Sequence, residues 1–142
     1  MKRKIKILAS LLFLFGSLCL TAQTNNPTTM QKLINKTWTL VSNNANECLY
    51  KHQYTATQLI ESVVCQEKTT SGNADFYLSN QIEATFDYSK VGNIQNGKYI
   101  IEYIPDLNGE SIFHVDEIIT ITDTYLETKS LKSGSTFKFN RQ

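Results

Sequence analysis

Cys48 and Cys65 are the residues with the plainest chemistry in this sequence, because they stand where a β-hairpin would bring them together. If segments 48–55 and 58–67 form an antiparallel hairpin, Cys48 faces Cys65. Directly opposed residues at a non-hydrogen-bonded site lie roughly 4.5 Å apart between Cα atoms, a separation that a disulfide spans. The pair lacks the close C-x-x-C spacing that tunes a redox-active thiol. We therefore predict a structural disulfide that stabilises the fold by roughly 3 kcal/mol.

Two histidines have ionisable neighbours in the expected strands. In the same hairpin His52 faces Glu61, an arrangement that suits a cross-strand ion pair or an acid/base couple, and such pairs are mostly structural. His114 and Asp116 are two residues apart and share a strand face, as two metal ligands would. A closed zinc site needs four ligands, and no third is identifiable. We predict no metal, no cofactor and no catalytic residue, since the sequence also has no nucleophile elbow or glycine-rich phosphate loop.

The third cysteine, Cys19, belongs to an N-terminal segment with the features of an export signal. Four basic residues among the first six precede the mainly apolar run 7–20, which is too short to span a bilayer comfortably. We predict that residues 1–22 are a signal peptide removed after Ala22, so that the mature domain is 23–142. Lipidation of Cys19 is the alternative, but Leu18 precedes it where a lipoprotein signal needs a small residue. The protein is therefore expected to be secreted or periplasmic, where a disulfide persists.

The charge of the expected mature chain argues against two classes of partner. The sequence has 14 basic and 13 acidic residues. Removal of the leader takes away four basic residues, which leaves 10 basic against 13 acidic residues and a net charge of −3. A mildly acidic domain without a Lys/Arg cluster has no electrostatic surface for nucleic acid or for an anionic membrane. Neither partner is expected.

The elements that position these residues are strands, and the pattern is clearest in 98–141, which reads as a four-stranded antiparallel meander. Alternating apolar positions mean that each strand buries one face and exposes the other. These positions are Tyr99, Ile101 and Tyr103 in 98–104; Phe113, Val115, Ile119 and Ile121 in 112–122; and Phe137 and Phe139 in 135–140.

The rest of the mature chain completes a small barrel. Asn26 followed by proline predicts a helix over 27–35 that buries a narrow apolar stripe. Further strands are expected at 37–43, which carries Trp38, and at 48–55, 58–67, 76–78 and 81–88. Polar loops are expected at 67–74 and 90–97, with turns at 108–109, 123–124 and 132–134. The fold class is all-β: an antiparallel up-and-down barrel of eight or nine strands with one short N-terminal helix, which leaves no free sheet edge.

Three segments carry a family resemblance. Residues 35–41 (NKTWTLV), 117–127 (EIITITDTYLE) and 137–139 (FKF) resemble, as a pattern, the lipocalin-like domain of secreted bacterial proteins. Members usually have a glycine two residues before the tryptophan, where this chain has Lys36. The resemblance implies an eight-stranded barrel with an apolar cavity that binds a ligand, and no catalytic residue.

Two functions fit this barrel. The first is binding of a small apolar or amphipathic molecule by a monomer. The alternative is a disulfide-stapled barrel whose loops 67–74 and 90–97 bind another protein, such as a hydrolase to be inhibited. Small barrels are either just filled by side chains or just wide enough for one ligand, so the aromatic residues fit a packed core as well as a cavity. The cavity wall expected for the first function consists of Trp38, Tyr99, Ile101, Tyr103, Phe113 and Phe137.

Overall fold

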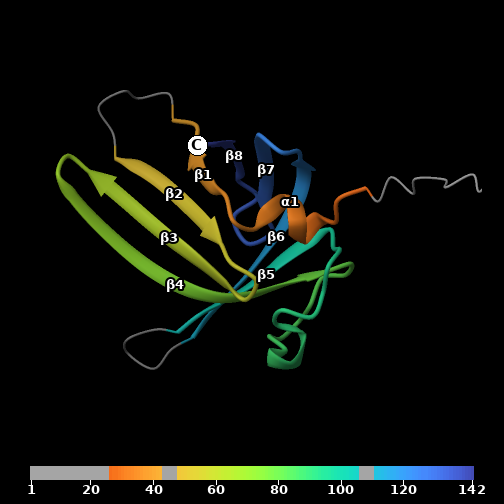
Figure 1. The fold of residues 1–142 in the computed structure, drawn as a ribbon. Coiled ribbons are helices and arrows are strands. Elements are labelled where there is room, and N and C mark those ends of the chain that lie inside the picture. Colours follow the sequence, from red (N-terminus) through yellow and green to blue (C-terminus); the bar gives the residue numbers. More distant parts are fainter. Residues whose placement is uncertain (1–25, 43–47, 106–110) are drawn as a thin grey trace, which may run out of the picture.

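The computed structural model describes residues 26–42, 48–105 and 111–142. In these residues eight antiparallel strands form a closed barrel, in which each strand pairs with its neighbours along the chain and β1 pairs with β8 (Figure 1). The strands are β1 (Thr37–Leu40), β2 (Leu49–Tyr54), β3 (Gln58–Cys65), β4 (Lys68–Ser79), β5 (Tyr99–Ile104), β6 (Ile112–Ile121), β7 (Tyr125–Ser130) and β8 (Thr136–Arg141). The predicted fold class is confirmed. The predicted leader with Cys19 and the turn at 108–109 lie outside the described residues.

The helix α1 (Thr29–Leu33) is shorter than the predicted 27–35 and is capped by Thr28 instead of Asn26. The Thr28 hydroxyl accepts a hydrogen bond from the backbone N–H of Gln31, and the Gln31 side chain accepts one from the backbone N–H of Thr28. This reciprocal capping box satisfies two free donors of the first turn. It explains why the helix begins two residues later than predicted.

The interior at the α1 end of the barrel is filled by side chains. Leu33 is fully buried, and its carbonyl oxygen accepts a 2.9 Å hydrogen bond from Nε1 of the fully buried Trp38. The packed core contains Met30, Leu33, Trp38, Tyr54, Leu59, Ala74, Phe76, Leu78, Ile100, Leu126 and Phe139. Trp38 thus closes this end of the barrel beneath α1.

The β2–β3 hairpin has the predicted register and the predicted disulfide. His52 faces Glu61, Leu49 faces Val64, and one residue beyond them Cys48 is bonded to Cys65 with a Cα–Cα distance of 4.3 Å. Disulfides persist in oxidising compartments and are rare in reducing ones. The bond therefore indicates an extracytoplasmic location.

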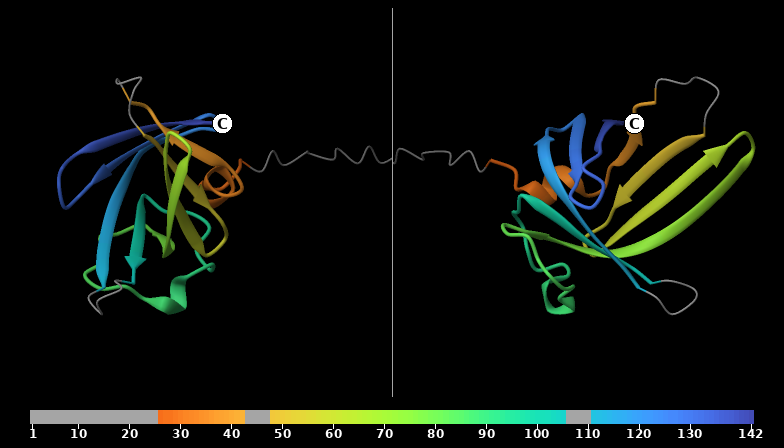
Figure 2. Two further views of the ribbon diagram at one scale, coloured as in Figure 1. Left: turned by 90° about the vertical axis from the view of Figure 1, so that its left-hand side faces the viewer. Right: turned by 180° about the vertical axis from the view of Figure 1, so that it is seen from behind.

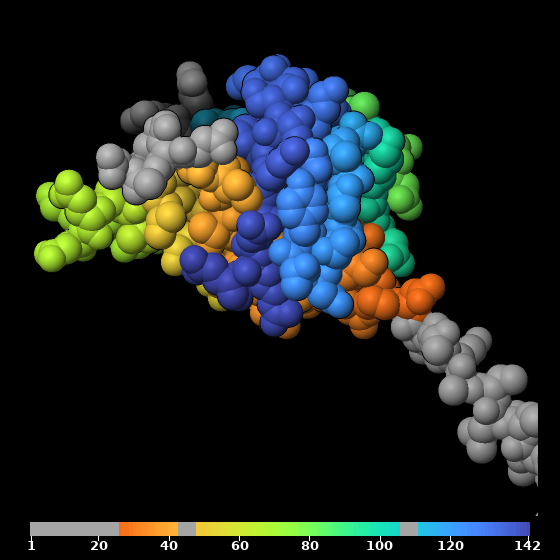
Figure 3. Space-filling view, turned by 90° about the horizontal axis from the view of Figure 1, so that it is seen from above, coloured from red at the N-terminus to blue at the C-terminus, as the bar shows by residue number. Residues whose placement is uncertain are grey.

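The predicted loop 67–74 is wrong, because these residues belong to the long strand β4. Gln66 adopts a positive φ of 54° and allows a tight turn, after which Lys68 pairs with Cys65. Residues 68–73 are polar and exposed, and backbone pairing with β3 holds them in place. The tip of this hairpin projects past the rest of the molecule (Figure 3). The protein-binding alternative therefore has a paired hairpin at 67–74 in place of the predicted loop.

The predicted strand 81–88 is also wrong. This stretch is irregular and leads into a short 3₁₀ helix, η1 (Tyr88–Lys90), which is capped by the Asp87 side chain. Its aromatic residues pack on the outer face of the barrel: the Phe86 ring lies 5.0 Å from that of Tyr77 and 5.3 Å from that of Tyr103. The alternation of apolar residues therefore does not mark a strand: Phe86 and Tyr88 contact other aromatic rings, while Ile82 is 61% exposed. The segment 80–97 lies beside β4 and β5 in both views of Figure 2.

Candidate functional site

The other end of the barrel interior is hollow. A cavity of about 700 Å³ lies between β1–β3 and β5–β8, on the side of the barrel that faces away from α1. The β2, β3 and β4 strands diverge from β7 and β8 toward the β3–β4 turn (Figure 1). The apolar lining residues are Leu40, Ile104, Phe137 and Phe139, and the polar ones are Tyr50, His52, Glu61, Glu102, His114, Asp116, Thr128, Ser130, Lys132 and Ser133. The site is therefore lined by apolar and polar side chains, and several of the polar ones are ionisable.

Strand alternation explains how β5 and β6 supply the ionisable groups. Glu102 faces His114 in the β5–β6 ladder, and Asp116 follows two residues later on the same side of β6. All three line the cavity, so the residues between them belong to the outer face of the sheet. The inner face of β6 is thus polar at His114 and Asp116, whereas Ile118 and Ile121 of the same strand pack against the core.

The expected wall on β5 and β6 is therefore wrong for Tyr99, Ile101, Tyr103 and Phe113, which occupy the outer face. Ile101 is fully buried there beside Tyr77, and Phe86 of the segment 80–97 contacts both Tyr77 and Tyr103. Because this outer face is covered, its apolar residues gave the same alternation as an inner face would give.

The two remaining wall residues face inward. Trp38 belongs to the packed end and is not in contact with the cavity, whereas Phe137 lines it. One of the six residues expected in the wall is thus found there.

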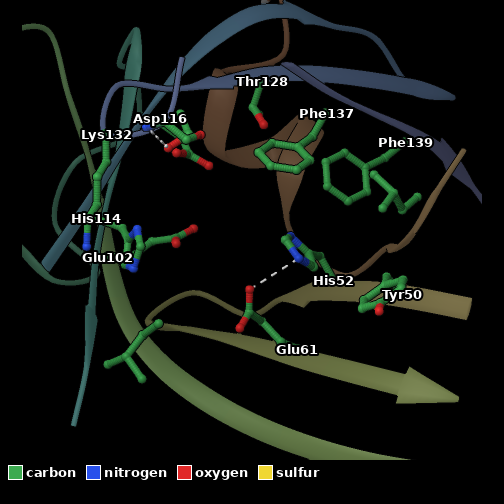
Figure 4. A pocket seen from close by; sticks show the side chains of 14 residues that line it. Tyr50, His52, Glu61, Glu102, His114, Asp116, Thr128, Lys132, Phe137 and Phe139 are labelled. Carbon is green, nitrogen blue, oxygen red and sulfur yellow. Dashed lines mark hydrogen bonds and ion pairs between the residues drawn. The ribbon is translucent and has the colours of Figure 1, made fainter. Parts of the chain in front are cut away.

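His52 and Glu61 form the predicted cross-strand pair in the floor of the cavity (Figure 4). The His52 Nε2 lies 3.2 Å from Oε1 of Glu61, and the imidazole lies 4.8 Å from the Phe139 ring. Its Nδ1 lies 3.5 Å from the hydroxyl of Tyr54, whose pKa is raised well above its ordinary value, first by burial. The hydrogen bond from His52 lowers the pKa of Glu61. His52 and Glu61 therefore serve as each other's hydrogen-bond and ion-pair partner.

Glu102 has the opposite environment. The residue is only 6% exposed, and no hydrogen bond or ion pair joins its carboxyl group to another described residue. Burial raises the pKa of Glu102 well above its ordinary value, and the negative charges of Asp116 and Glu61 add to the effect. Figure 4 shows this carboxyl group pointing into the cavity beside His114. Among the described residues Thr39 Oγ1 is the one buried side-chain N or O atom without a hydrogen-bond partner, so the Glu102 oxygens are accessible from the cavity, where a bound group can reach them.

Asp116 is intermediate between the two glutamates. Burial raises the pKa of Asp116, while His114, His52 and a hydrogen bond with Ser130 oppose the rise. His114 itself lies across the ladder from Glu102. The predicted proximity of His114 and Asp116 is confirmed.

The described residues contain no cluster of three or more His, Cys, Asp and Glu side chains able to hold a metal ion. Within the same residues no helix has the length and apolar character needed to cross a membrane. No family model matches the chain, and no curated protein or solved structure is significantly similar to it. The site must therefore be interpreted from its own geometry.

The sequence analysis missed Glu102 as a site residue. It is the one charged residue in the strand sequence YIIEYI of β5. A charged side chain inside an apolar strand that is covered on both faces must be buried, and a buried charge marks a candidate site. That signal was present, but reading it required knowing that the outer face of β5 is covered.

Proposed function

We propose that this chain is a secreted or periplasmic lipocalin-like protein that binds one small amphipathic molecule inside its barrel without transforming it. The observation that carries the proposal is the cavity of about 700 Å³, which is lined by Glu102, a residue only 6% exposed whose carboxyl group has no hydrogen-bond or ion-pair partner among the described residues. Ligand sites typically measure about 300 to 1,000 Å³ and combine apolar walls with a few convergent polar groups. The disulfide supports the extracytoplasmic location.

The two phenylalanine rings of the lining are separated in space from two of its carboxyl groups, which favours an amphipathic ligand over a purely apolar one. Phe137 and Phe139 come from β8, while Glu102 and Asp116 come from β5 and β6 on another side of the cavity (Figure 4). An apolar chain can pack against the rings while a polar head reaches the carboxyl groups.

Titration with the neutral fluorescent probe N-phenyl-1-naphthylamine tests the proposal, with two tryptophan variants as a matched pair. Leu40 lines the cavity, so Leu40→Trp fills part of it, whereas the next residue, Val41, is 48% exposed and Val41→Trp adds the same side chain outside. We expect saturable binding to the wild type, at least a tenfold loss in Leu40→Trp, and a change of less than about twofold in Val41→Trp. Absence of probe binding to the wild type, or equal binding by both variants, would reject the proposal.

A further inference from the structure

The geometry points to a ligand whose polar head is a positively charged amine, held by the carboxyl groups of Glu61, Glu102 and Asp116. The inference rests on the proposed function and specifies its ligand class. Three strands, β3, β5 and β6, each direct one of these groups into the same cavity. Figure 4 shows Glu102 and Asp116 on one side and Glu61 on the other, with open space between them.

The cavity contains more acidic groups than fixed positive charges. Among the described lining residues Lys132 is the one side chain with a permanent positive charge, and it is exposed in the turn between β7 and β8. No ion pair joins Lys132 to any of the three carboxyl groups in the described part of the chain. Glu61 is paired with His52 and Asp116 is hydrogen-bonded to Ser130, so Glu102 is the carboxyl group to which a positive charge from outside the protein would supply a partner.

An amine suits the cluster better than other polar heads do. A carboxylate ligand would add a fourth acidic group to three that already repel one another. A hydroxyl group can donate one hydrogen bond and so satisfy one carboxyl group. An ammonium group donates three hydrogen bonds in different directions and carries the opposite charge, so it can reach several carboxyl groups at once.

Binding of an amine is also expected to release a proton. In the empty cavity the raised pKa of Glu102 favours its neutral form, whereas a bound ammonium group favours the carboxylate. The ionisable groups that share the cavity or its floor with Glu102 are His114 and Asp116 from β6, Glu61 from β3, Tyr50, His52 and Tyr54 from β2, and Lys132 from the β7–β8 turn. Of these, His52 is engaged by Glu61 and Asp116 by Ser130, whereas no hydrogen bond or ion pair engages the side chain of Glu102 or His114 among the described residues.

Competition among three octyl compounds tests the inference. n-Octylamine, n-octanol and n-octanoate share an apolar chain and differ in the head, and each displaces the naphthyl probe at neutral pH if it binds. We expect octylamine to bind at least tenfold more tightly than octanol, and octanoate to bind most weakly. Glu102→Gln preserves the shape of the side chain and should weaken the binding of octylamine much more than that of octanol, so that the amine preference falls about tenfold. Glu67→Gln, in the exposed β3–β4 turn, is the matched control and should leave the amine preference unchanged.

A second measurement does not depend on any variant. Calorimetric titration of the wild type with octylamine in phosphate and in MOPS, neither of which carries a primary ammonium group, should show a release of protons, and octanol should release none. Equal affinities for the three compounds would overturn the amine assignment while leaving the binding protein intact, and no proton release with octylamine would overturn the change of protonation assigned to Glu102. If the probe itself does not bind, the proposed function fails and the amine assignment fails with it.

Discussion

The two ends of the barrel interior differ in what they contain: one is packed with apolar side chains, and the other holds a cavity lined in part by ionisable groups. At the α1 end Trp38, Leu33 and Phe76 are fully buried in a continuous apolar core. At the other end β1–β3 and β5–β8 line a cavity of about 700 Å³, and Glu61, Glu102 and Asp116 are among the lining residues. Burying apolar groups stabilises a fold, whereas burying a carboxyl group without a partner costs free energy. The comparison indicates that the packed end stabilises the barrel more than the hollow end, where we propose that the ligand binds.

Loss of a ring should therefore cost much more at the packed end than at the hollow end. Trp38→Ala removes a fully buried side chain and its hydrogen bond to Leu33, so we expect a loss of about 3 to 5 kcal/mol in the free energy of unfolding. Phe137→Ala removes a ring that already borders the cavity, and the expected loss is less than half as large. Urea denaturation of both variants measures the difference. Equal losses would show that the hollow end contributes to stability as much as the packed end does.

The disulfide is expected to have the next largest effect. Cys48 and Cys65 are 17 residues apart, and closing a loop of this length should stabilise the fold by about 3 kcal/mol through restriction of the unfolded chain. The double variant Cys48→Ala/Cys65→Ala should lose that amount in urea denaturation. Adding a reductant should lower the wild type to the same stability and leave the double variant unaffected. A double variant as stable as the oxidised wild type would contradict the prediction.

The sequence predicted the packed features of the barrel better than the cavity. The register of the β2–β3 hairpin and the disulfide followed from residue positions alone, because one turn determines which residues face each other. The inner and outer faces of β5 did not follow, because Ile101 on the outer face is as buried as Ile100 on the inner face. The two faces of β5 differ in that segment 80–97 packs on the outer face. The local sequence pattern gives no signal of this long-range contact. Glu102 was missed for the same reason.

Glu102 should make the hollow end less stable as the pH rises. Its pKa is raised in the folded state, so its contribution is most favourable below about 4.3, the ordinary pKa of glutamate in an unfolded chain, and is lost as the pH rises toward the folded value. Glu102→Gln removes this dependence. We expect the stability of the variant relative to wild type to increase with pH by up to about 1.4 kcal/mol per unit across that interval. Denaturant titrations from pH 4 to pH 8 test this, and a difference that stays constant with pH would contradict it.

Glu61 should show the smallest effect, with the opposite sign. The hydrogen bond from His52 lowers its pKa in the folded state, so the pair contributes stability above the unfolded pKa and loses it as the pH falls through the folded value. The Glu61 side chain is 44% exposed, and solvent screening should keep the loss in Glu61→Gln below about 1 kcal/mol near neutral pH. The loss of stability in Glu61→Gln relative to wild type should become smaller as the pH falls. Over the same fall in pH, the gain in stability of Glu102→Gln relative to wild type should disappear. Two glutamates in one cavity would then respond to pH in opposite directions, because His52 satisfies one of them and no described residue satisfies the other. Parallel responses would show that the cavity treats both carboxyl groups alike, which would remove the reason to assign Glu102 to a ligand.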